Sequence, residues 1–307
     1  MITPVRRVAA LCALAAALAP LTACGTAQDT RAVRTADSAT APAVGGARNA
    51  VPTPSRTPAS PSRTPAAPSR TPTLAPGPAG LTPVFRNGPR TAGRTVALTF
   101  DADMTADQGA RAAAGEHFDN PGLITALRTL KVPATVFMTG RWAEEYPDQA
   151  RSLGRDPGFE IANHSYSHHA FTDDCYGLPT VPEDAMRTDV ERAYTAFRKA
   201  GVTSAMPYFR FPGGCYDQRA LRAVSGLGVT AVQWDVVSGD AFATDADAVA
   251  RQVLDGVRPG SVVVMHCTRS AAPTTEQVVR TVVPELRRRG YRFVKVSELI
   301  ATAGGRR

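Results

Sequence analysis

Val96-Ala97-Leu98-Thr99-Phe100-Asp101-Ala102-Asp103 is the stretch that decides the fold, because an apolar run ends there in two carboxylates. Five residues rich in branched and aromatic side chains are typical of a buried β-strand. Carboxylates at the end of such a strand are hard to explain as core, since an unpaired buried carboxylate is costly. In extended backbone the side chains of Asp101 and Asp103 share a face, whereas Ala102 points away. The alternative interpretation is that the two aspartates cap the next helix.

Six further apolar segments have the same strand character, and helical patterns lie between them. One helix signal is Asn120-Pro121, an N-cap residue followed by proline at the first helical position. Strands that alternate with helices predict an α/β fold with about seven parallel strands, most simply a barrel-like (β/α) arrangement. In such folds the chemistry gathers at the carboxyl ends of the strands. The six segments span residues 134–139, 159–162, 208–211, 231–234, 261–265 and 293–296.

Two of the five histidines, His164 and His168, lie four residues apart. If residues 163–168 begin a helical turn, both imidazoles lie on one face and reach one ion. A divalent metal then needs a third ligand, usually a carboxylate, and Asp101 and Asp103 are the candidates. The alternative is that both histidines are structural and hydrogen-bonded within the fold.

Other polar residues also follow predicted strands. Arg210 follows the fourth strand, Asp235 the fifth and His266 the sixth. Burial lowers the pKa of a histidine and a nearby carboxylate raises it, so His266 needs Asp240 or Asp235 beside it to donate a proton near neutral pH. Cys267 adjoins His266, but neighbours on a strand point to opposite faces and do not form a Cys–His pair.

These strand-end residues occur in an ordered set that resembles the polysaccharide deacetylases of carbohydrate esterase family 4, the NodB-homology domain. The resemblance covers roughly residues 94–300, and the ordered set is far more specific than any single motif. The matching segments are Thr99-Phe100-Asp101, Asn163-His164-Ser165-Tyr166-Ser167-His168, Arg210-Phe211-Pro212, Trp234-Asp235 to Asp240, and Val264-Met265-His266.

The resemblance implies a distorted barrel with fewer than eight repeats and metal-dependent removal of acetyl groups from sugars. His164 and His168 match the family's metal-binding histidines, and one divalent ion, zinc or cobalt, is the implied cofactor. Asp101 matches the catalytic base, Arg210 the arginine that positions this base, and His266 the catalytic acid. A backbone N–H near Gly213 is expected to stabilise the tetrahedral oxyanion.

The first departure from the family pattern concerns the metal. Ala102 replaces the family's metal-binding second aspartate, and Asp103 stands where the family has glycine. Because Asp101 and Asp103 share a face, Asp103 is the expected third ligand, and the division of roles between the two aspartates stays open.

A second departure concerns the substrate side of the cleft. The family's Asp-Trp motif reads Asp240-Ala241 here, so the usual aromatic wall is missing, with Phe242 as a weak replacement. We expect Gly213, Trp234 and Asp240 to contact substrate, although Trp234 at a strand end is equally compatible with a core position.

Three cysteines remain in the predicted domain. The loops that carry Cys175 and Cys215 border the same cleft of the family fold, so a Cys175–Cys215 disulfide is favoured over a Cys215–Cys267 bridge. The odd count leaves one thiol free, and this is expected to be Cys267.

The amino-terminal end has the pattern of an export signal, expected over residues 1–23. Arg6-Arg7 precedes the apolar stretch 8–20, which is too short to span a bilayer comfortably. Leu21-Thr22-Ala23-Cys24 resembles a bacterial lipobox, in which Cys24 is lipidated and anchors the protein to the extracytoplasmic side of the cell membrane. The alternative is an ordinary signal peptide with a chance cysteine.

Residues 24–90 are expected to form a disordered linker, because proline, serine, threonine and arginine dominate and Ser-Arg-Thr-Pro recurs at 55, 62 and 69. Residues 1–94 hold 11 Lys/Arg and 2 Asp/Glu (+9), and the remainder holds 24 and 25 (−1). The predicted domain, 91–302, is therefore nearly neutral, which argues against a nucleic-acid partner.

The sequence thus predicts a lipid-anchored, monomeric, metal-dependent polysaccharide deacetylase. Its expected substrate is the N-acetyl amino sugar of the cell wall, a peptidoglycan- or chitin-like polymer. Two alternatives stay open, namely an esterase acting on O-acetyl groups of a xylan-type glycan and a glycan-binding domain without catalysis.

Overall fold

A computed structural model describes residues 71–91 and 93–304. The expected signal peptide, Cys24 and most of the expected linker therefore lie outside the described residues. Within those two ranges, no helix combines the length and the apolar character that crossing a bilayer requires.

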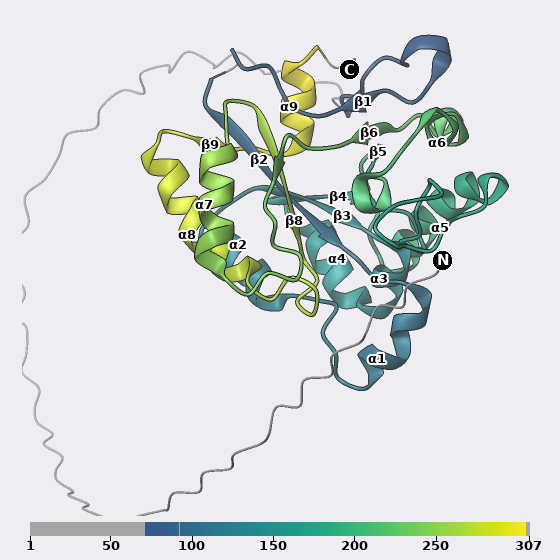
Figure 1. Ribbon diagram of the computed structural model, residues 1–307, viewed down its shortest axis with the longest axis horizontal. Coiled ribbons are helices and arrows are strands. Elements are labelled where there is room, and N and C mark those ends of the chain that lie inside the picture. Colours follow the sequence, from purple (N-terminus) through teal and green to yellow (C-terminus); the bar gives the residue numbers. More distant parts are fainter. Residues whose placement is uncertain (1–70, 92, 305–307) are drawn as a thin grey trace, which may run out of the picture. The chain divides into compact units, whose positions relative to one another are not determined.

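The core of the fold is one parallel sheet in the order β1-β6-β5-β4-β3-β2-β8-β7, with β9 paired to the start of β2. The sheet curls into a half-barrel (Figure 1). This half-barrel is open because its two end strands, β1 and β7, do not pair with each other. The prediction of a distorted α/β barrel of parallel strands is confirmed. The strands are β1 Val84–Phe85, β2 Thr95–Ala102, β3 Ala134–Met138, β4 Phe159–Asn163, β5 Tyr208–Phe209, β6 Thr230–Val232, β7 Val236–Val237, β8 Ser261–His266 and β9 Arg292–Phe293.

Helices cover the outside of the sheet. In Figure 1, α2, α7 and α8 lie on one flank of the sheet and α3, α4 and α5 on the other. The predicted cap at Asn120 is confirmed, since its side chain accepts a hydrogen bond from the Leu123 amide at 3.0 Å. The helices are α1 Gly109–Ala113, α2 Pro121–Thr129, α3 Gly140–Glu145, α4 Pro147–Arg155, α5 Met186–Lys199, α6 Gln218–Ala223, α7 Ala246–Gly256, α8 Thr275–Arg288 and α9 Val296–Thr302.

The concave side of the sheet has its own apolar core, which α9 completes. Leu299 and Ile300 of α9 pack against side chains from the strands, and the carboxylate of Glu160 accepts the backbone N–H of Ser297 at 3.1 Å. Because α9 covers the concave side beside the beginnings of the strands, only their carboxyl ends are left for a site. The strand residues of this core are Phe85, Ala97, Phe137, Ala162, Tyr208, Val232 and Val262.

The expected linker boundary at residue 90 needs correction, because residues 71–90 include part of the folded unit. β1 pairs with β6, the Tyr208 hydroxyl donates to the Pro72 carbonyl at 2.7 Å, and the Leu74 amide donates to Thr230 at 3.1 Å. A strand of two residues leaves no alternation to recognise in a proline-rich sequence. The same reason explains why β7 was not predicted.

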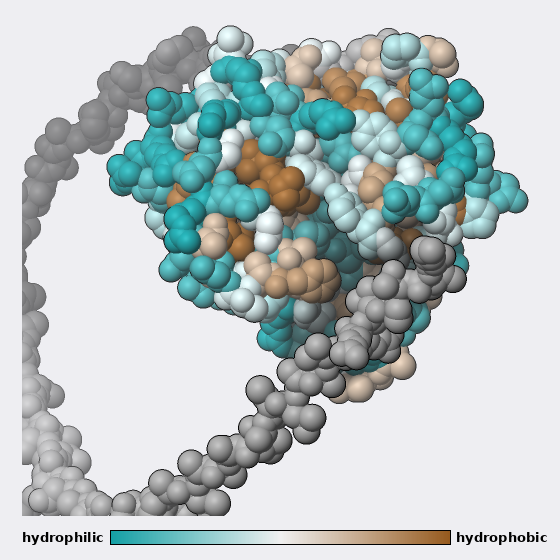
Figure 2. Space-filling view, viewed as in Figure 1, coloured by the Kyte–Doolittle hydropathy of each residue, from teal (hydrophilic) through white to brown (hydrophobic). Residues whose placement is uncertain are grey.

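The outer surface is mostly polar. Figure 2 shows hydrophilic residues over much of one face, interrupted by small hydrophobic patches. Only three large apolar side chains are strongly exposed among the described residues, and they are Tyr176, Val237 and Phe242.

Candidate active site

The predicted site residues come together at the carboxyl ends of the strands. Asp101 is the second-to-last residue of β2 and pairs in the parallel ladder with His266, the last residue of β8. His164 follows β4 directly, and Arg210 follows β5. Parallel strands bring these ends to one edge of the sheet, as predicted.

The segment from His164 to His168 is a loop, so the predicted helical turn is wrong. Ser165 and His168 have positive φ angles of 66° and 57°, which a right-handed helix excludes. The Asn163 side chain accepts the Ser165 amide at 2.8 Å, and Asp189 accepts the Tyr166 amide at 3.0 Å. These side chains satisfy the loop backbone and hold both imidazoles toward the same point.

Asp103, His164 and His168 offer three ligand atoms that lie within 4.8 Å of one another. Oδ1 of Asp103 is 3.3 Å from Nε2 of His164 and 3.5 Å from Nε2 of His168. This oxygen is buried and has no hydrogen-bond partner, which is unusual for a buried carboxylate. One carboxylate and two imidazoles around one point are a donor set that suits a divalent metal ion.

The orientation of His164 also suits metal binding. Its Nδ1 lies 2.9 Å from the Arg210 carbonyl, so the Nδ1–H donates there and the Nε2 lone pair faces Asp103. Metal-binding histidines usually hold their second nitrogen in this way. The backbone N–H of Asp103 donates to the Thr268 hydroxyl at 3.0 Å, and this hydrogen bond fixes the backbone that carries the carboxylate.

Electrostatics favour the ligand forms of Asp103 and His168 but not that of His164. Burial tends to raise the pKa of Asp103, but the imidazoles of His168 and His164 lower it, so the carboxylate is ionised. Burial lowers the pKa of His168 to about 4, which leaves this ring neutral. Burial would lower the pKa of His164, but the Asp101 and Asp103 carboxylates raise it, so a metal at this ring competes with a proton.

Asp101 is held in a different environment from Asp103. Arg210, which is fully buried, donates from Nη1 to Oδ1 of Asp101 at 2.6 Å, while Oδ2 lies 3.7 Å from Nε2 of His164. The guanidinium group packs on the ring of Phe137 at 3.9 Å. Asp101 is therefore a positioned carboxylate next to the metal-binding group, with one oxygen engaged by Arg210.

His266 pairs with Asp240. Its Nδ1 is 2.8 Å from Oδ1 of Asp240, and its backbone N–H donates to Oδ2 at 2.8 Å. Burial alone would lower the pKa of His266, but the hydrogen bond and charge of Asp240 raise it to about 10. The imidazole is therefore protonated at neutral pH, with Nε2 4.0 Å from Asp103.

Two expectations about acidic residues need correction. Asp240 is only 1% exposed, and its oxygens accept hydrogen bonds from His266, Ser238 and Thr275. The expectation that Asp240 contacts substrate is therefore wrong. Asp235, the alternative partner of His266, instead accepts the Val262 amide at the start of β8. The unpredicted strand β7 separates the two aspartates and carries Asp240 to the opposite end of the sheet.

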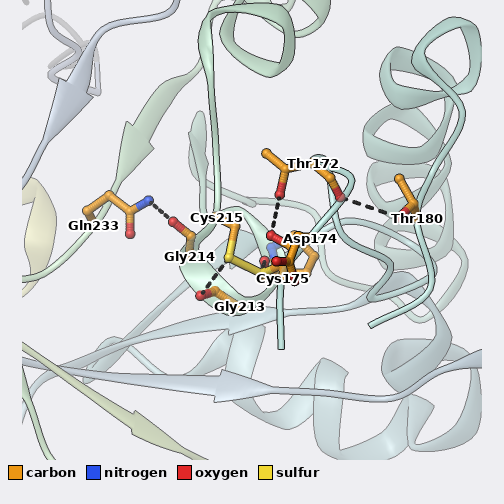
Figure 3. Close-up of a disulfide and its surroundings, with 9 residues drawn as sticks. Thr172, Asp174, Cys175, Thr180, Gly213, Gly214, Cys215 and Gln233 are labelled. Atoms are coloured by element: carbon orange, nitrogen blue, oxygen red, sulfur yellow. Dashed lines mark hydrogen bonds between the residues drawn. A yellow bond between two sulfur atoms is a disulfide. The ribbon is translucent and has the colours of Figure 1, made fainter. Parts of the chain in front are cut away.

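The turn after Arg210 is fixed by the Cys175–Cys215 disulfide (Figure 3). Gly213 has a φ of 65°, and a Cβ atom there would lie 2.5 Å from Sγ of Cys175, so only glycine fits beside the bridge. The side chain of Gln233 donates to the Gly214 carbonyl at 2.9 Å from the other side. The half-buried Trp234 packs against Gly214, where it belongs partly to the apolar core.

Cys267 does not take part in the chemistry of the site. It is buried and free of any disulfide, and burial raises the pKa of its thiol to about 12. A thiol of this kind is not a nucleophile at neutral pH. The adjacency of His266 and Cys267 in the sequence therefore does not indicate a catalytic Cys–His pair.

Several supporting residues could not be recognised in the sequence. Asp189 holds the histidine loop from the first turn of α5, and Ser238 and Thr275 donate their hydroxyls to Asp240 at 2.8 and 2.7 Å. Each is an ordinary polar residue of a helix or loop without a spacing that marks it. Their hydrogen bonds to the histidine loop and to Asp240 become visible only in the folded structure.

Residues 88–232 match the family model described as "Polysaccharide deacetylase". This match places residues 88–232 in that family. The matched region begins just after β1 and includes Asp101, Asp103, His164, His168 and Arg210.

Individual relatives agree with the family assignment. The chain is 28% identical to a chitooligosaccharide deacetylase of Bradyrhizobium, over 67% of this chain and 90% of the relative. It is also 28% identical to a peptidoglycan-N-acetylglucosamine deacetylase of Bacillus cereus, over 61% of this chain and 65% of the relative. Among solved structures, a family 4 carbohydrate esterase of Streptomyces lividans in complex with acetate is 26% identical, with a TM-score of 0.54, over 69% of this chain and 96% of that one.

Proposed function

We propose that this chain removes the N-acetyl groups of amino sugars in a polysaccharide by metal-dependent hydrolysis of the carbon–nitrogen amide bond. The observation that carries the proposal is the buried, unpartnered Oδ1 of Asp103 facing Nε2 of His164 and His168. The relatives named for chitooligosaccharides and peptidoglycan N-acetylglucosamine support an N-acetyl substrate.

The metal ligands in this proposal are Asp103, His164 and His168. A divalent ion held by them would act as a Lewis acid toward the acetyl carbonyl and the attacking water. This assignment divides the two aspartates, because only Asp103 lies among the mutually close ligand atoms. Zinc and cobalt both suit two imidazoles and one carboxylate.

Asp101 is the general base of the proposed reaction. Its Oδ1 is bound to Arg210 at 2.6 Å, and Oδ2 remains beside the metal-binding group, where it takes the proton of the attacking water. Arg210 acts as a positioning residue, because it is fully buried and fixes the carboxylate from behind. A backbone N–H at the Gly213 turn would stabilise the developing oxyanion.

His266 is the general acid. Its Nδ1 is engaged by Asp240, so the protonated Nε2 is the nitrogen that faces the site and delivers a proton to the departing amine. The charge of Asp240 keeps this proton on the ring at neutral pH. The pair thus supplies the leaving group with a proton that water alone provides slowly.

The test is acetate release by the full chain from three substrates, namely N-acetylglucosamine oligomers, peptidoglycan and acetylated xylan. We expect release from the first two, loss of activity with a chelator, and recovery on adding Zn²⁺ or Co²⁺. His164→Ala should lose both metal and activity. Release from acetylated xylan alone would replace the proposal with an O-acetyl esterase, and release from none of the three would overturn it.

We further propose that the chain is exported and anchored to the outer face of the cell membrane through Cys24. The support is sequence alone, namely Arg6-Arg7, the apolar stretch 8–20 and the lipobox-like Leu21-Thr22-Ala23-Cys24. Cys24→Ala should move the protein from the membrane fraction into the soluble extracytoplasmic fraction. An unchanged membrane fraction for Cys24→Ala would contradict lipidation.

A further inference from the structure

The proposed third ligand, Asp103, lies just beyond the part of the chain that the sheet holds. Ala102 is the last residue of β2, and Asp103 follows it outside any strand or helix. Toward β8, the Cys267 N–H donates to the carbonyl of Asp101 at 2.7 Å, two residues before the ligand. Toward β3, the Thr139 N–H donates to the Ala102 carbonyl at 3.1 Å. The backbone ladder thus reaches the residue before Asp103 on both sides.

Two threonine hydroxyls hold the chain where this ladder ends. On the β8 side, the Thr268 hydroxyl accepts the Asp103 N–H at 3.0 Å and donates to the Asp103 carbonyl at 3.3 Å. On the β3 side, the Thr139 hydroxyl accepts the Met104 N–H at 3.2 Å and lies 3.3 Å from the carbonyls of Ala102 and Met104. Thr139 is fully buried and Thr268 is 2% exposed, so water does not compete for these hydrogen bonds.

Both threonines are themselves fixed by neighbouring structure. The Thr268 carbonyl accepts the N–H groups of Ala271 and Ala272 at 3.1 and 2.8 Å, which closes a tight turn after β8. The Thr139 side chain caps α3, because its hydroxyl also accepts the Trp142 N–H at 3.2 Å. The two hydroxyls therefore have positions that do not depend on Asp103, and they can impose a position on it.

The Asp103 carboxylate needs this support. Its Oδ1 is buried without a hydrogen-bond partner, an unfavourable arrangement that a shift of the chain toward water would relieve. A metal ligand, however, has to be held within about 0.5 Å of its productive position. By holding the backbone on both sides, the two threonines oppose the shift and keep Oδ1 facing the two imidazoles.

The histidine half of the metal-binding group is held by other contacts. The loop that carries His164 and His168 is fixed by the side chains of Asn163 and Asp189. The hydrogen bonds of Thr268 and Thr139, by contrast, go to the Asp103 segment, to the turn after β8 and to α3. Removing a threonine hydroxyl should therefore displace the carboxylate and leave the two imidazoles in place.

We infer that Thr268 and Thr139 are positioning residues of the metal site, which hold Asp103 as a ligand beyond the end of β2. The inference rests on the proposed function and deepens it, because it explains how a residue outside the sheet serves as the third ligand. Both threonines act through backbone groups, and Thr268 has the larger share because both the N–H and the carbonyl of Asp103 bond to its hydroxyl.

The experiment measures the Zn²⁺ affinity of the full chain by competition with a coloured chelator, with His164→Ala as the background. Thr268→Val removes the hydroxyl and keeps the branched shape, whereas Thr268→Ser keeps the hydroxyl and is the conservative variant. Thr230→Val is the matched control, because Thr230 is also fully buried and its hydroxyl accepts the Leu74 N–H at 3.1 Å, at the start of β6. Unfolding temperatures in excess chelator give the stability of each variant without metal.

Thr268→Val should raise the Kd for Zn²⁺ by roughly 10- to 100-fold, the usual cost of losing a residue that orients a metal ligand. Thr268→Ser should bind Zn²⁺ as wild type does, and Thr230→Val should do so even though it unfolds at a lower temperature in chelator. The visible spectrum of bound Co²⁺, which reports ligand geometry, should change in Thr268→Val and not in Thr230→Val. If Thr268→Val does not fold, Thr268→Ala removes the same hydroxyl without adding bulk.

Failure of this inference and failure of the proposed function give different results. Equal Zn²⁺ affinity in wild type and Thr268→Val, or equal losses in Thr268→Val and Thr230→Val, would overturn the positioning role while leaving the enzyme proposal intact. Weaker Zn²⁺ binding by Thr268→Val in a chain that releases no acetate would support the positioning role and count against the enzyme. A wild-type chain that binds neither Zn²⁺ nor Co²⁺ above the His164→Ala background would overturn both.

Discussion

Breaking the buried ion pair between Arg210 and Asp101 should destabilise the fold strongly, and the size of the loss can be worked out from the structure. Arg210 is fully buried, Asp101 is 4% exposed, and Nη1 lies 2.6 Å from Oδ1. Removing one partner of a buried pair costs about 3–5 kcal/mol, because the other charge stays in the core. For a folded unit of this size we expect Arg210→Met to lower Tm by roughly 6–20 °C.

The assay is a double-mutant cycle with Arg210→Met, Asp101→Asn and the double variant. Unfolding is followed by circular dichroism in denaturant, with a chelator present so that metal does not compensate for the missing charge. The double variant leaves neither charge buried, so it should be less destabilised than the sum of the single variants by up to about 3 kcal/mol.

Additivity within about 0.5 kcal/mol would refute this reasoning, because it would mean that the two groups are not coupled in energy. A control for lost packing comes from Arg210→Lys. Lysine retains a charge but not the planar group that lies 3.9 Å from Phe137 and donates from Nε to the Val232 carbonyl at 3.2 Å. This variant should fall between wild type and Arg210→Met.

Three further outcomes are expected. Asp101→Asn should keep bound metal and lose activity, whereas Asp103→Asn should lose metal, as measured by elemental analysis; the reverse result would exchange the two roles. His266→Ala should reduce turnover of the amide by about 10²–10⁴-fold and that of an activated aryl ester much less, because a phenolate leaves without a proton, and equal losses would exclude proton delivery. Burial raises the pKa of Glu160, so its stabilising effect is complete below the ordinary carboxyl pKa and is lost as pH rises through the folded-state value. Glu160→Gln should therefore unfold at a higher temperature than wild type at pH 8 and match it near pH 4, and a gain that is independent of pH would contradict the burial argument.

Long apolar strands and their polar ends could be predicted from the sequence. The run that ends at Asp101 marks β2, and parallel pairing then places His266 beside it, so the position of the site follows from strand order. The short strands β1 and β7 could not be predicted, because two residues carry no periodicity. Missing β7 made Asp235 and Asp240 look like neighbours, although they lie at opposite ends of β8.

Loop geometry was the second limit. The spacing of His164 and His168 suggested a helix, but side chains distant in sequence, such as Asp189, stabilise a loop with positive φ instead. The Asn163 side chain accepts the backbone N–H of Ser165, and this local hydrogen bond stabilises the loop instead of a helix. Exposure is likewise a property of the folded molecule, so nothing in the sequence distinguished Tyr176 from any other tyrosine.

The first and last residues of the folded unit lie away from the carboxyl ends of the strands, where the site is. Pro72 and Leu74 lie beside Tyr208 and Thr230, which are the first residues of β5 and β6, and α9 covers the concave side of the sheet. A folded unit coupled to a bead directly at residues 71–74 would therefore keep its substrate-binding edge directed outward. Such an arrangement suits a solid polymer that cannot diffuse, since the support and the glycan would approach the molecule from opposite directions.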